Sequence, residues 1–124
     1  MVDDHEPFRR FVHSTLETKP ELQIIGQASD GADAVRRAAS LRPHLILLDI
    51  GLPTVSGIEA AWQIRKLTPE SKIIFVTQES SEEVIEEAFR LGAKGYVVKS
   101  AASRDLLPAI EAVLSGGRFL SRRL

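Results

Sequence analysis

The sequence predicts a doubly wound α/β fold, in which five parallel strands form one sheet and five helices cover its two faces. Three observations lead to this prediction. The chain has 124 residues, which is the length of a single domain. Short runs of branched apolar residues alternate with longer segments whose apolar residues recur at helical spacing. The short runs contain few polar residues, as expected for parallel strands that are buried on both faces.

The predicted strands are four short apolar runs and a stub at the start of the chain. The stub is Met1-Val2, so the first strand is expected to be truncated. The other runs lie at 22–28, 45–48, 73–76 and 96–98. Because a helical segment separates each run from the next, right-handed crossovers should bring the strands into parallel alignment.

Five amphipathic segments are the predicted helices, and most of them begin with a residue suited to a first turn. Pro7 lies in the first turn of the first helix, where its missing N–H costs nothing. Asp30 can cap the second helix, Gly57 opens the third, and Ser80 or Ser81 can cap the fourth. The apolar positions of the five helices are Phe8, Phe11 and Val12; Val35, Ala38 and Ala39; Ala60, Ala61, Ile64 and Leu67; Val84, Ile85, Ala88 and Phe89; and Leu106, Leu107, Ile110, Val113 and Leu114.

Charge and composition exclude several classes of protein. The chain has 16 Lys and Arg against 17 Asp and Glu, a net charge of -1, so it lacks the basic excess with which proteins bind nucleic acid. The absence of cysteine excludes disulfides and thiolate metal sites. The apolar runs are far shorter than the roughly 20 residues of a membrane-spanning helix. We therefore expect a cytoplasmic domain without membrane contact.

Polar residues follow four of the five predicted strands, at the edge where open α/β sheets bind ligands. Asp3 and Asp4 follow the first strand, and Asp49, Thr77 and Lys99 follow the last three. Three carboxylates at one edge repel one another unless a cation lies among them, and Mg²⁺ prefers such oxygen ligands. A carboxylate can also attack phosphorus when cations neutralise the transferring group. The pattern predicts a phosphoryl site with a nucleophile, a metal, an ammonium and a hydroxyl.

Four segments of the sequence resemble the receiver domain of two-component response regulators. They are Asp-Asp-His-Glu-Pro at 3–7, Leu-Leu-Asp-Ile-Gly-Leu-Pro at 47–53 with Gly57 downstream, Ile-Phe-Val-Thr at 74–77, and Gly-Ala-Lys-Gly-Tyr-Val-Val-Lys at 92–99. The opening segment, the Ser100 that follows Lys99 and the closing Gly-Gly-Arg-Phe-Leu-Ser are similar to the NarL/FixJ (LuxR-type) branch. The resemblance covers nearly the whole chain.

This resemblance implies a flavodoxin-like, CheY-like fold with strand order 2-1-3-4-5 and a function in signal transduction. Asp49 would accept a phosphoryl group from a sensor histidine kinase. Asp3, Asp4, Asp49 and the backbone carbonyl of Gly51 would hold Mg²⁺ or Mn²⁺. The domain would be no enzyme beyond the phosphorylation and dephosphorylation of its own Asp49.

The resemblance also implies a switch next to the phosphoacceptor. Thr77 and Lys99 would bind the phosphoryl group, and Tyr96 would change rotamer with Thr77. The positions expected to tune attack by water are Gly51, Gln78 and Glu79. Ser100 replaces the proline that often follows the lysine in this family, and it leaves open the isomer of a bond that is commonly cis there.

The resemblance divides the chain into two parts. Residues 1–116 would form the receiver domain, and residues 117–124 would begin a linker to a C-terminal output domain outside this sequence. That output domain would contact DNA and regulate transcription, and phosphorylation would favour a homodimer. Family members usually carry some five apolar residues before the acidic pair, so the stub predicts lower stability than that of a complete receiver.

Three alternative functions stay open. One is a stand-alone receiver. Another is a phosphatase of the haloacid dehalogenase type, which usually has a second acid two residues after its nucleophile, where this chain has Gly51. A flavodoxin-like FMN carrier needs a Ser/Thr/Gly-rich phosphate loop after its first strand, where this chain has Asp3 and Asp4.

Overall fold

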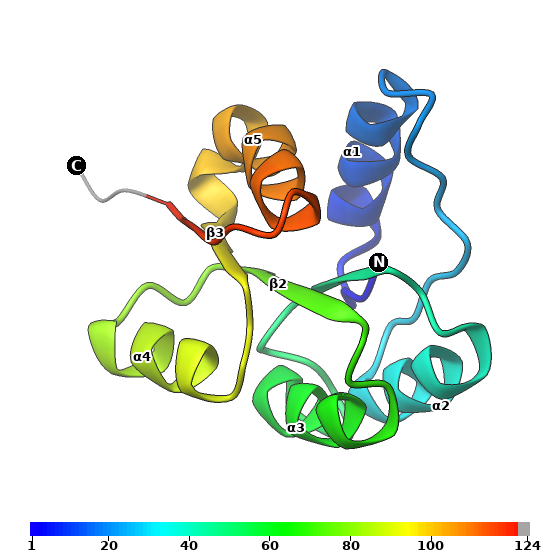
Figure 1. Cartoon of the computed structure of the whole chain (residues 1–124), viewed down its shortest axis with the longest axis vertical. Helices are drawn as coiled ribbons and strands as arrows, with labels where there is room; N and C mark the ends of the chain where they lie inside the picture. Colours follow the sequence, from blue (N-terminus) through cyan, green and yellow to red (C-terminus); the bar gives the residue numbers. More distant parts are fainter. Residues whose placement is uncertain (122–124) are drawn as a thin grey trace.

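The computed structural model describes residues 1–121 and shows a parallel sheet between two layers of helices (Figure 1). Two helices cover one face, namely α1 (Glu6–Glu17) and α5 (Ala102–Leu114). The other face is covered by α2 (Gly31–Leu41), α3 (Gly57–Leu67) and α4 (Glu82–Arg90). The doubly wound α/β class and the five helices are therefore as predicted. A short 3₁₀ helix, Lys99–Ala101, joins the sheet to α5.

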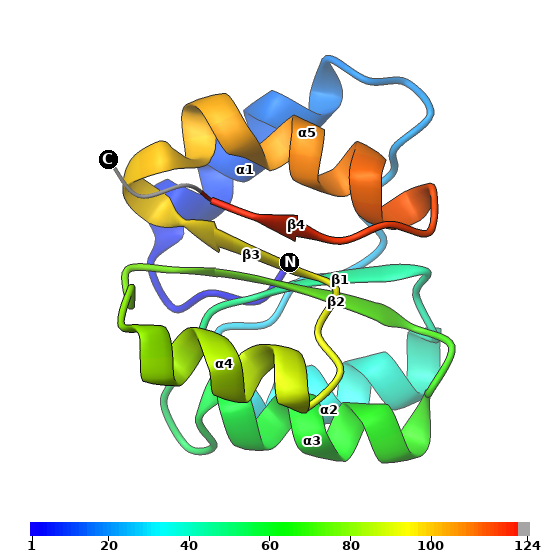
Figure 2. The ribbon, with the colours of Figure 1, turned by 60° about the vertical axis from the view of Figure 1, so that its left-hand side comes forward.

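Within residues 1–121, the sheet contains four parallel strands in the order β1-β2-β3-β4. They are β1 (Leu45–Leu48), β2 (Lys72–Thr77), β3 (Gly95–Val98) and β4 (Phe119–Leu120). The first three coincide with predicted runs. The last, which lies beside β3 in Figure 2, falls within 117–124, the segment expected to begin a linker. Residues 122–124 of that segment lie outside the described residues.

The prediction of five strands is wrong, because the stub and the segment 22–28 form no ladder. Val2 alone pairs, through single parallel bridges to Ala28 and to Leu48. Its N–H donates to the Leu47 carbonyl at 2.8 Å. A strand needs neighbouring hydrogen bonds along its length, and one paired residue leaves most of 22–28 without a partner strand. The order 2-1-3-4-5 is therefore not confirmed, although Val2 does lie between Ala28 and Leu48.

Alternate side chains of the strands enter two separate apolar cores, as the period of two along a strand requires. The core beneath α2, α3 and α4 takes Ile46, Leu48, Ile73, Phe75 and Tyr96. The core beneath α1 and α5 takes Leu47, Ile74, Val76 and Val97. All nine of these side chains are buried, so the strands are covered on both faces as predicted.

Caps and one close contact fix the helices against the sheet. The side chains of Asp30 and Ser81 accept hydrogen bonds from backbone N–H groups in the first turns of α2 and α4, as predicted. Ser56, which the sequence analysis did not single out, caps α3 in the same way. A Cβ at Gly57 would lie 1.9 Å from the carbonyl oxygen of Asp49, so only glycine permits this approach. The start of α3 therefore lies directly against the end of β1.

Within residues 1–121, no helix combines the length and the apolar character needed to span a lipid bilayer. The peptide bonds described are all trans, including the Lys99–Ser100 bond whose isomer the sequence leaves open.

Candidate functional site

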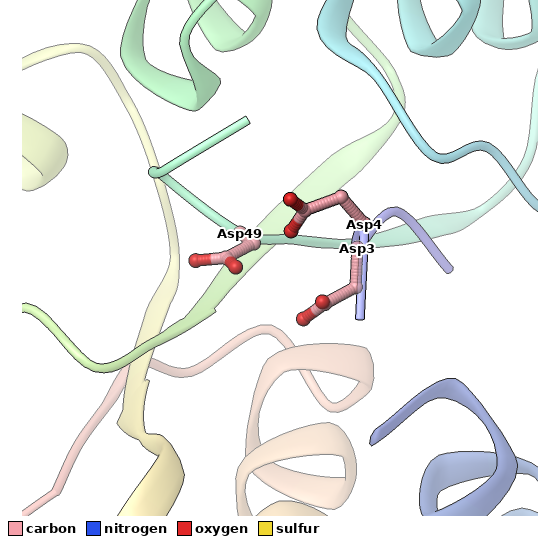
Figure 3. Close-up of side chains that lie close together, drawn as sticks. All are labelled: Asp3, Asp4 and Asp49. Carbon is pink, nitrogen blue, oxygen red and sulfur yellow. The ribbon is translucent and has the colours of Figure 1, made fainter. Parts of the chain in front are cut away.

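Three carboxylates meet at the end of the sheet where the strands terminate (Figure 3). Asp3 and Asp4 follow Val2, and Asp49 follows β1 directly. The bridge between Val2 and Leu48 brings these two chain segments side by side, and the Asp49 N–H donates to the Val2 carbonyl at 3.0 Å. One oxygen from each carboxylate lies within 4.8 Å of the other two. The predicted convergence of the three acids is therefore present.

The three carboxylates differ in their exposure to solvent. Asp3 is fully buried and Asp49 is 6% exposed, whereas Asp4 is exposed to solvent. Backbone N–H groups support the two buried acids: His5 donates to Oδ1 of Asp3 at 2.8 Å, and Ile50 donates to Oδ1 of Asp49 at 2.7 Å. Two acids of the cluster are thus fixed by the backbone, and the third faces water.

Lys99 provides the cation of the site. It follows β3, and its Nζ lies 2.7 Å from Oδ2 of Asp3 and 3.1 Å from Oδ2 of Asp49. Its side chain is 13% exposed, and Nζ also lies 4.6 Å from the centroid of the Phe8 ring, a cation–π contact from α1. The ammonium therefore offsets part of the repulsion between the two buried carboxylates.

Burial and neighbouring charges shift the pKa values of Asp3 and Lys99. Burial raises the pKa of Asp3 above its usual value, and the contacts with Lys99 and the His5 N–H only partly oppose this effect. For Lys99, burial acts to lower the pKa, but the contacts with the Asp3 and Asp49 carboxylates outweigh it, so that the pKa is raised. Lys99 consequently stays charged at neutral pH.

The donor set suits a hard divalent cation. Three carboxylates supply only oxygen ligands, which are those that Mg²⁺ prefers. Oδ2 of Asp3 is buried, and its contact with Lys99 is an ion pair rather than a well-aligned hydrogen bond, so a cation would satisfy it further. Gly51, the predicted carbonyl ligand, is exposed in the turn after Asp49. The residues present therefore fit the metal that the sequence predicts.

Thr77 and Tyr96, the predicted switch residues, are both buried near this cluster. Thr77 ends β2 and pairs in register with Val98, the residue before Lys99. Its Oγ1 accepts a hydrogen bond from the Glu79 N–H at 3.4 Å. The hydroxyl of Tyr96 donates to the Glu79 carbonyl at 2.7 Å, and the tyrosine ring is fully buried in the core beneath α2, α3 and α4. Gln78 and Glu79 themselves are exposed.

Two contacts of the site were missed from the sequence. The guanidinium of Arg9 donates to the backbone carbonyl of Asp3 and so fixes the turn that carries the acidic pair. Phe8, which helical spacing assigns to an apolar face, also covers Lys99. The signal that could have found them is the start of α1 at Glu6, because its first turn must lie beside the acidic pair.

The comparison with protein families gives one match that covers most of the chain. The family described as "Response regulator receiver domain" matches residues 1–111. Among curated proteins, the nitrate/nitrite response regulator protein NarL of Escherichia coli K12 is 32% identical over 124 residues. The DNA-binding transcriptional activator DevR/DosR of Mycobacterium tuberculosis H37Rv is 35% identical over 123 residues. The matches cover 100% and 99% of this chain but only 57% of each relative, so the chain spans little more than half their length.

Among solved structures, a LuxR-family two-component response regulator from Aurantimonas sp. SI85-9A1 has the same fold, with a TM-score of 0.92 and 34% identity. The match covers 97% of this chain and 86% of that one. The family match, the two regulators and this structure agree with the resemblance that the acidic pair, the Asp49 segment and the Lys99 segment predict. The chain belongs to the response regulator receiver domain family, in its NarL/LuxR-type branch.

Proposed function

We propose that this chain is a phosphorylatable receiver, in which Asp49 takes a phosphoryl group from the phosphohistidine of a sensor kinase. The observation that carries the proposal is the arrangement around Asp49. Asp3 and Asp4 each bring a carboxylate oxygen within 4.8 Å of its own, and the ammonium of Lys99 lies 3.1 Å from its Oδ2. A nucleophilic carboxylate, a set of metal ligands and a fixed cation are the groups that phosphoryl transfer needs.

The proposed reaction is a displacement at phosphorus. An oxygen of Asp49 forms a new O–P bond while the N–P bond to the imidazole of the kinase breaks. The electron pair of that bond returns to the imidazole nitrogen, which takes up a proton from water. Negative charge on the transferring oxygens needs neutralisation, and Lys99 can supply it because its raised pKa keeps it charged.

A divalent metal fits the same site. Mg²⁺ or Mn²⁺, when held by Asp3, Asp4, Asp49 and the Gly51 carbonyl, would neutralise charge on the phosphoryl oxygens. Asp4 is exposed and can receive a hydrated ion, whereas Asp3 holds Lys99 as well. Asp3 and Lys99 therefore position charge around Asp49 from the buried side.

The switch follows from differential binding by two residues. If Thr77 and Lys99 bind the phosphoryl group in only one conformer, each bond to the charged group contributes about 1.5–3 kcal/mol. Together these bonds shift an equilibrium by roughly two to four orders of magnitude. The Thr77 hydroxyl accepts a hydrogen bond from the Glu79 N–H and keeps its own proton to donate to the phosphoryl group, while Tyr96 binds the Glu79 carbonyl. Gln78 and Glu79, both exposed beside Thr77, and Gly51 then affect access by water.

The proposed output is regulation of transcription. One relative is named as a DNA-binding transcriptional activator, and both curated relatives are longer than this chain. We propose that residues 1–116 act as the receiver, that 117–124 lead to a DNA-binding output domain, and that phosphorylation favours a homodimer in the cytoplasm. A stand-alone receiver is the alternative, and the gene sequence after residue 124 distinguishes the two.

The phosphoacceptor can be tested with a small donor. The chain is incubated with Mg²⁺ and acetyl phosphate, and its intact mass is measured. One phosphoryl adduct is expected, absent in Asp49→Asn and retained in the control Asp33→Asn, which changes a half-buried acid on α2 outside the cluster. An adduct that survives Asp49→Asn contradicts the assignment. Continuous release of phosphate from many phosphate esters supports the phosphatase instead.

A further inference from the structure

The strand β4, which the sequence did not predict, attaches the end of the described chain to β3, the strand that leads into Lys99. The Phe119 N–H donates to the Lys94 carbonyl at 3.0 Å, and the Ser121 N–H donates to the Tyr96 carbonyl at 2.9 Å. β4 therefore lies along β3, as Figure 2 shows, and Ser121, the residue after β4, is bonded to Tyr96, the residue proposed as a switch. Arg118, just before β4, also lies 4.8 Å from the centroid of the Phe89 ring on α4.

The side chain of Ser121 joins three elements. Its Oγ accepts a hydrogen bond from the Val98 N–H at 3.2 Å and donates one to Oδ2 of Asp105 at 2.8 Å. Val98 ends β3 immediately before Lys99, and Asp105 lies in the first turn of α5. Ser121 is 4% exposed and Asp105 is 8% exposed, so both lie out of water. This buried hydroxyl fixes the backbone from which Lys99 extends.

The Asp105 carboxylate is itself held in place as an anion. The guanidinium of Arg104 donates to both of its oxygens, at 2.9 and 3.3 Å. The hydrogen bond from Arg104 is the main cause of a lowered pKa for Asp105, burial opposes it, and the bond from Ser121 lowers it further. A carboxylate in the first turn of a helix also interacts favourably with the helix dipole. Asp105 is consequently a rigid acceptor for Ser121.

We propose that the hydrogen bond between the side chains of Ser121 and Asp105 acts as a latch. Through this latch, a phosphoryl group on Asp49 and the pairing of β4 with β3 stabilise each other. The inference rests on the proposed function of Asp49. In the structure, Lys99 contacts Asp49 while Ser121 binds the backbone of Val98 and Tyr96. The contact at Asp49 and the attachment of the segment after β4 are therefore present in the same conformation. Added negative charge on Asp49 strengthens the contact with Lys99 and hence favours this arrangement. Coupling between two sites is reciprocal, so loss of the latch should weaken the binding of a phosphoryl group, or of its mimic, at Asp49.

Ser121 and Asp105 are therefore positioning residues for Lys99, and their role can be tested with a phosphoryl mimic. Beryllium fluoride with Mg²⁺ is titrated by calorimetry into the wild-type chain, Ser121→Ala and the control Ser103→Ala, which removes an exposed hydroxyl from α5. Backbone amide exchange at Phe119 and Ser121 is followed in parallel. We expect the mimic to slow exchange at both amides in the wild type. Ser121→Ala should lose this response and bind the mimic about fivefold or more weakly, whereas Ser103→Ala should match the wild type.

Other outcomes separate the latch from plain structural support and from the proposed function. Equal affinity in the wild type and Ser121→Ala, with faster exchange of β4 in the variant, overturns the latch. If Ser121→Ala does not fold, Asp105→Asn weakens the same bond while keeping an acceptor oxygen, and unchanged affinity there overturns the latch equally. Ser121→Thr restores the hydroxyl and should recover the wild-type affinity. A wild-type chain that does not bind the mimic contradicts the function proposed for Asp49 itself.

Discussion

Thr77 and Tyr96 bind the same residue, Glu79, from opposite sides of its backbone. Thr77 accepts a hydrogen bond from the Glu79 N–H, and Tyr96 donates one to the Glu79 carbonyl. The first contact is long, at 3.4 Å, and the second is short, at 2.7 Å. A movement of Thr77 toward Asp49 would therefore lengthen the weaker of these two bonds first, while the shorter bond from Tyr96 would still hold Glu79.

Removal of the Tyr96 hydroxyl tests this attachment. Tyr96→Phe keeps the buried ring but leaves the Glu79 carbonyl without this donor. We expect the free energy of unfolding in urea to fall by about 1 kcal/mol, the usual net contribution of one hydrogen bond. Amide exchange of residues 78–81 should accelerate, while exchange within β1 should not change. Unaltered exchange at 78–81 would show that Tyr96 does not hold this segment.

Replacement of Lys99 by glutamine should destabilise the chain in a manner that depends on pH. The change leaves Asp3 and Asp49 without their shared cation, and loss of one partner of a buried ion pair costs about 3–5 kcal/mol. The pKa of Asp3, already raised, should rise further. A raised carboxyl pKa means that the folded state binds its proton more tightly, so the associated stability is present at low pH and is lost as pH rises through the folded pKa.

The loss of unfolding free energy caused by Lys99→Gln should therefore grow as the pH rises above the usual carboxyl pKa of about 4. Urea unfolding at several pH values measures it. The control is Lys94→Gln, which removes an exposed lysine close in sequence and should give a constant, small difference. A deficit that is equal at all pH values would mean that Lys99 does not compensate the buried carboxylates.

Metal binding should depend on the exposed acid of the cluster. Asp4→Ala is expected to abolish the heat of Mg²⁺ binding in calorimetry while leaving the melting temperature close to that of the wild type, because the side chain is exposed. Asp33→Ala removes an acid far along the chain on α2 and should bind Mg²⁺ normally. Undiminished Mg²⁺ binding by Asp4→Ala would refute the proposed ligand set.

The start of the chain offers a test of stability. A groove of about 540 Å³ lies beside Met1, and its lining includes Leu22, Ile24, Ile46 and Leu114. Five branched apolar residues added before Met1 should pair with the segment 22–28 and fill this groove. The expected rise in melting temperature is roughly 3–5 °C for each kcal/mol gained. A Gly/Ser extension of equal length is the control, and an equal effect of both extensions would argue against strand pairing.

The sequence predicts most of the site because the necessary information is local. Asp49, Thr77 and Lys99 each follow a run of branched apolar residues, and parallel strands bring their carboxyl ends to one edge. The caps at Asp30 and Ser81 depend on a contact within three residues, so they too could be predicted.

Features that depend on distant contacts could not be predicted in this way. β4 forms because Ser121 meets Asp105 and the backbone of Tyr96, and a two-residue strand after paired glycines has no periodic pattern. The number of strands was wrong for a similar reason, since the pairing of 22–28 depends on Val2, far away in the chain. The second role of Phe8 was missed because spacing identifies an apolar face but not the charge that lies over it.

The close packing of Gly57 against the backbone carbonyl of Asp49 bears on which residues of this site can change between related proteins. Since main-chain atoms of α3 lie against the main chain of Asp49, the proposed phosphoacceptor, backbone packing rather than the surrounding side chains sets the position of that residue. Residues of the neighbouring loops can then change in evolution, and under the proposed function alter the lifetime of the phosphoryl group, without displacing Asp49.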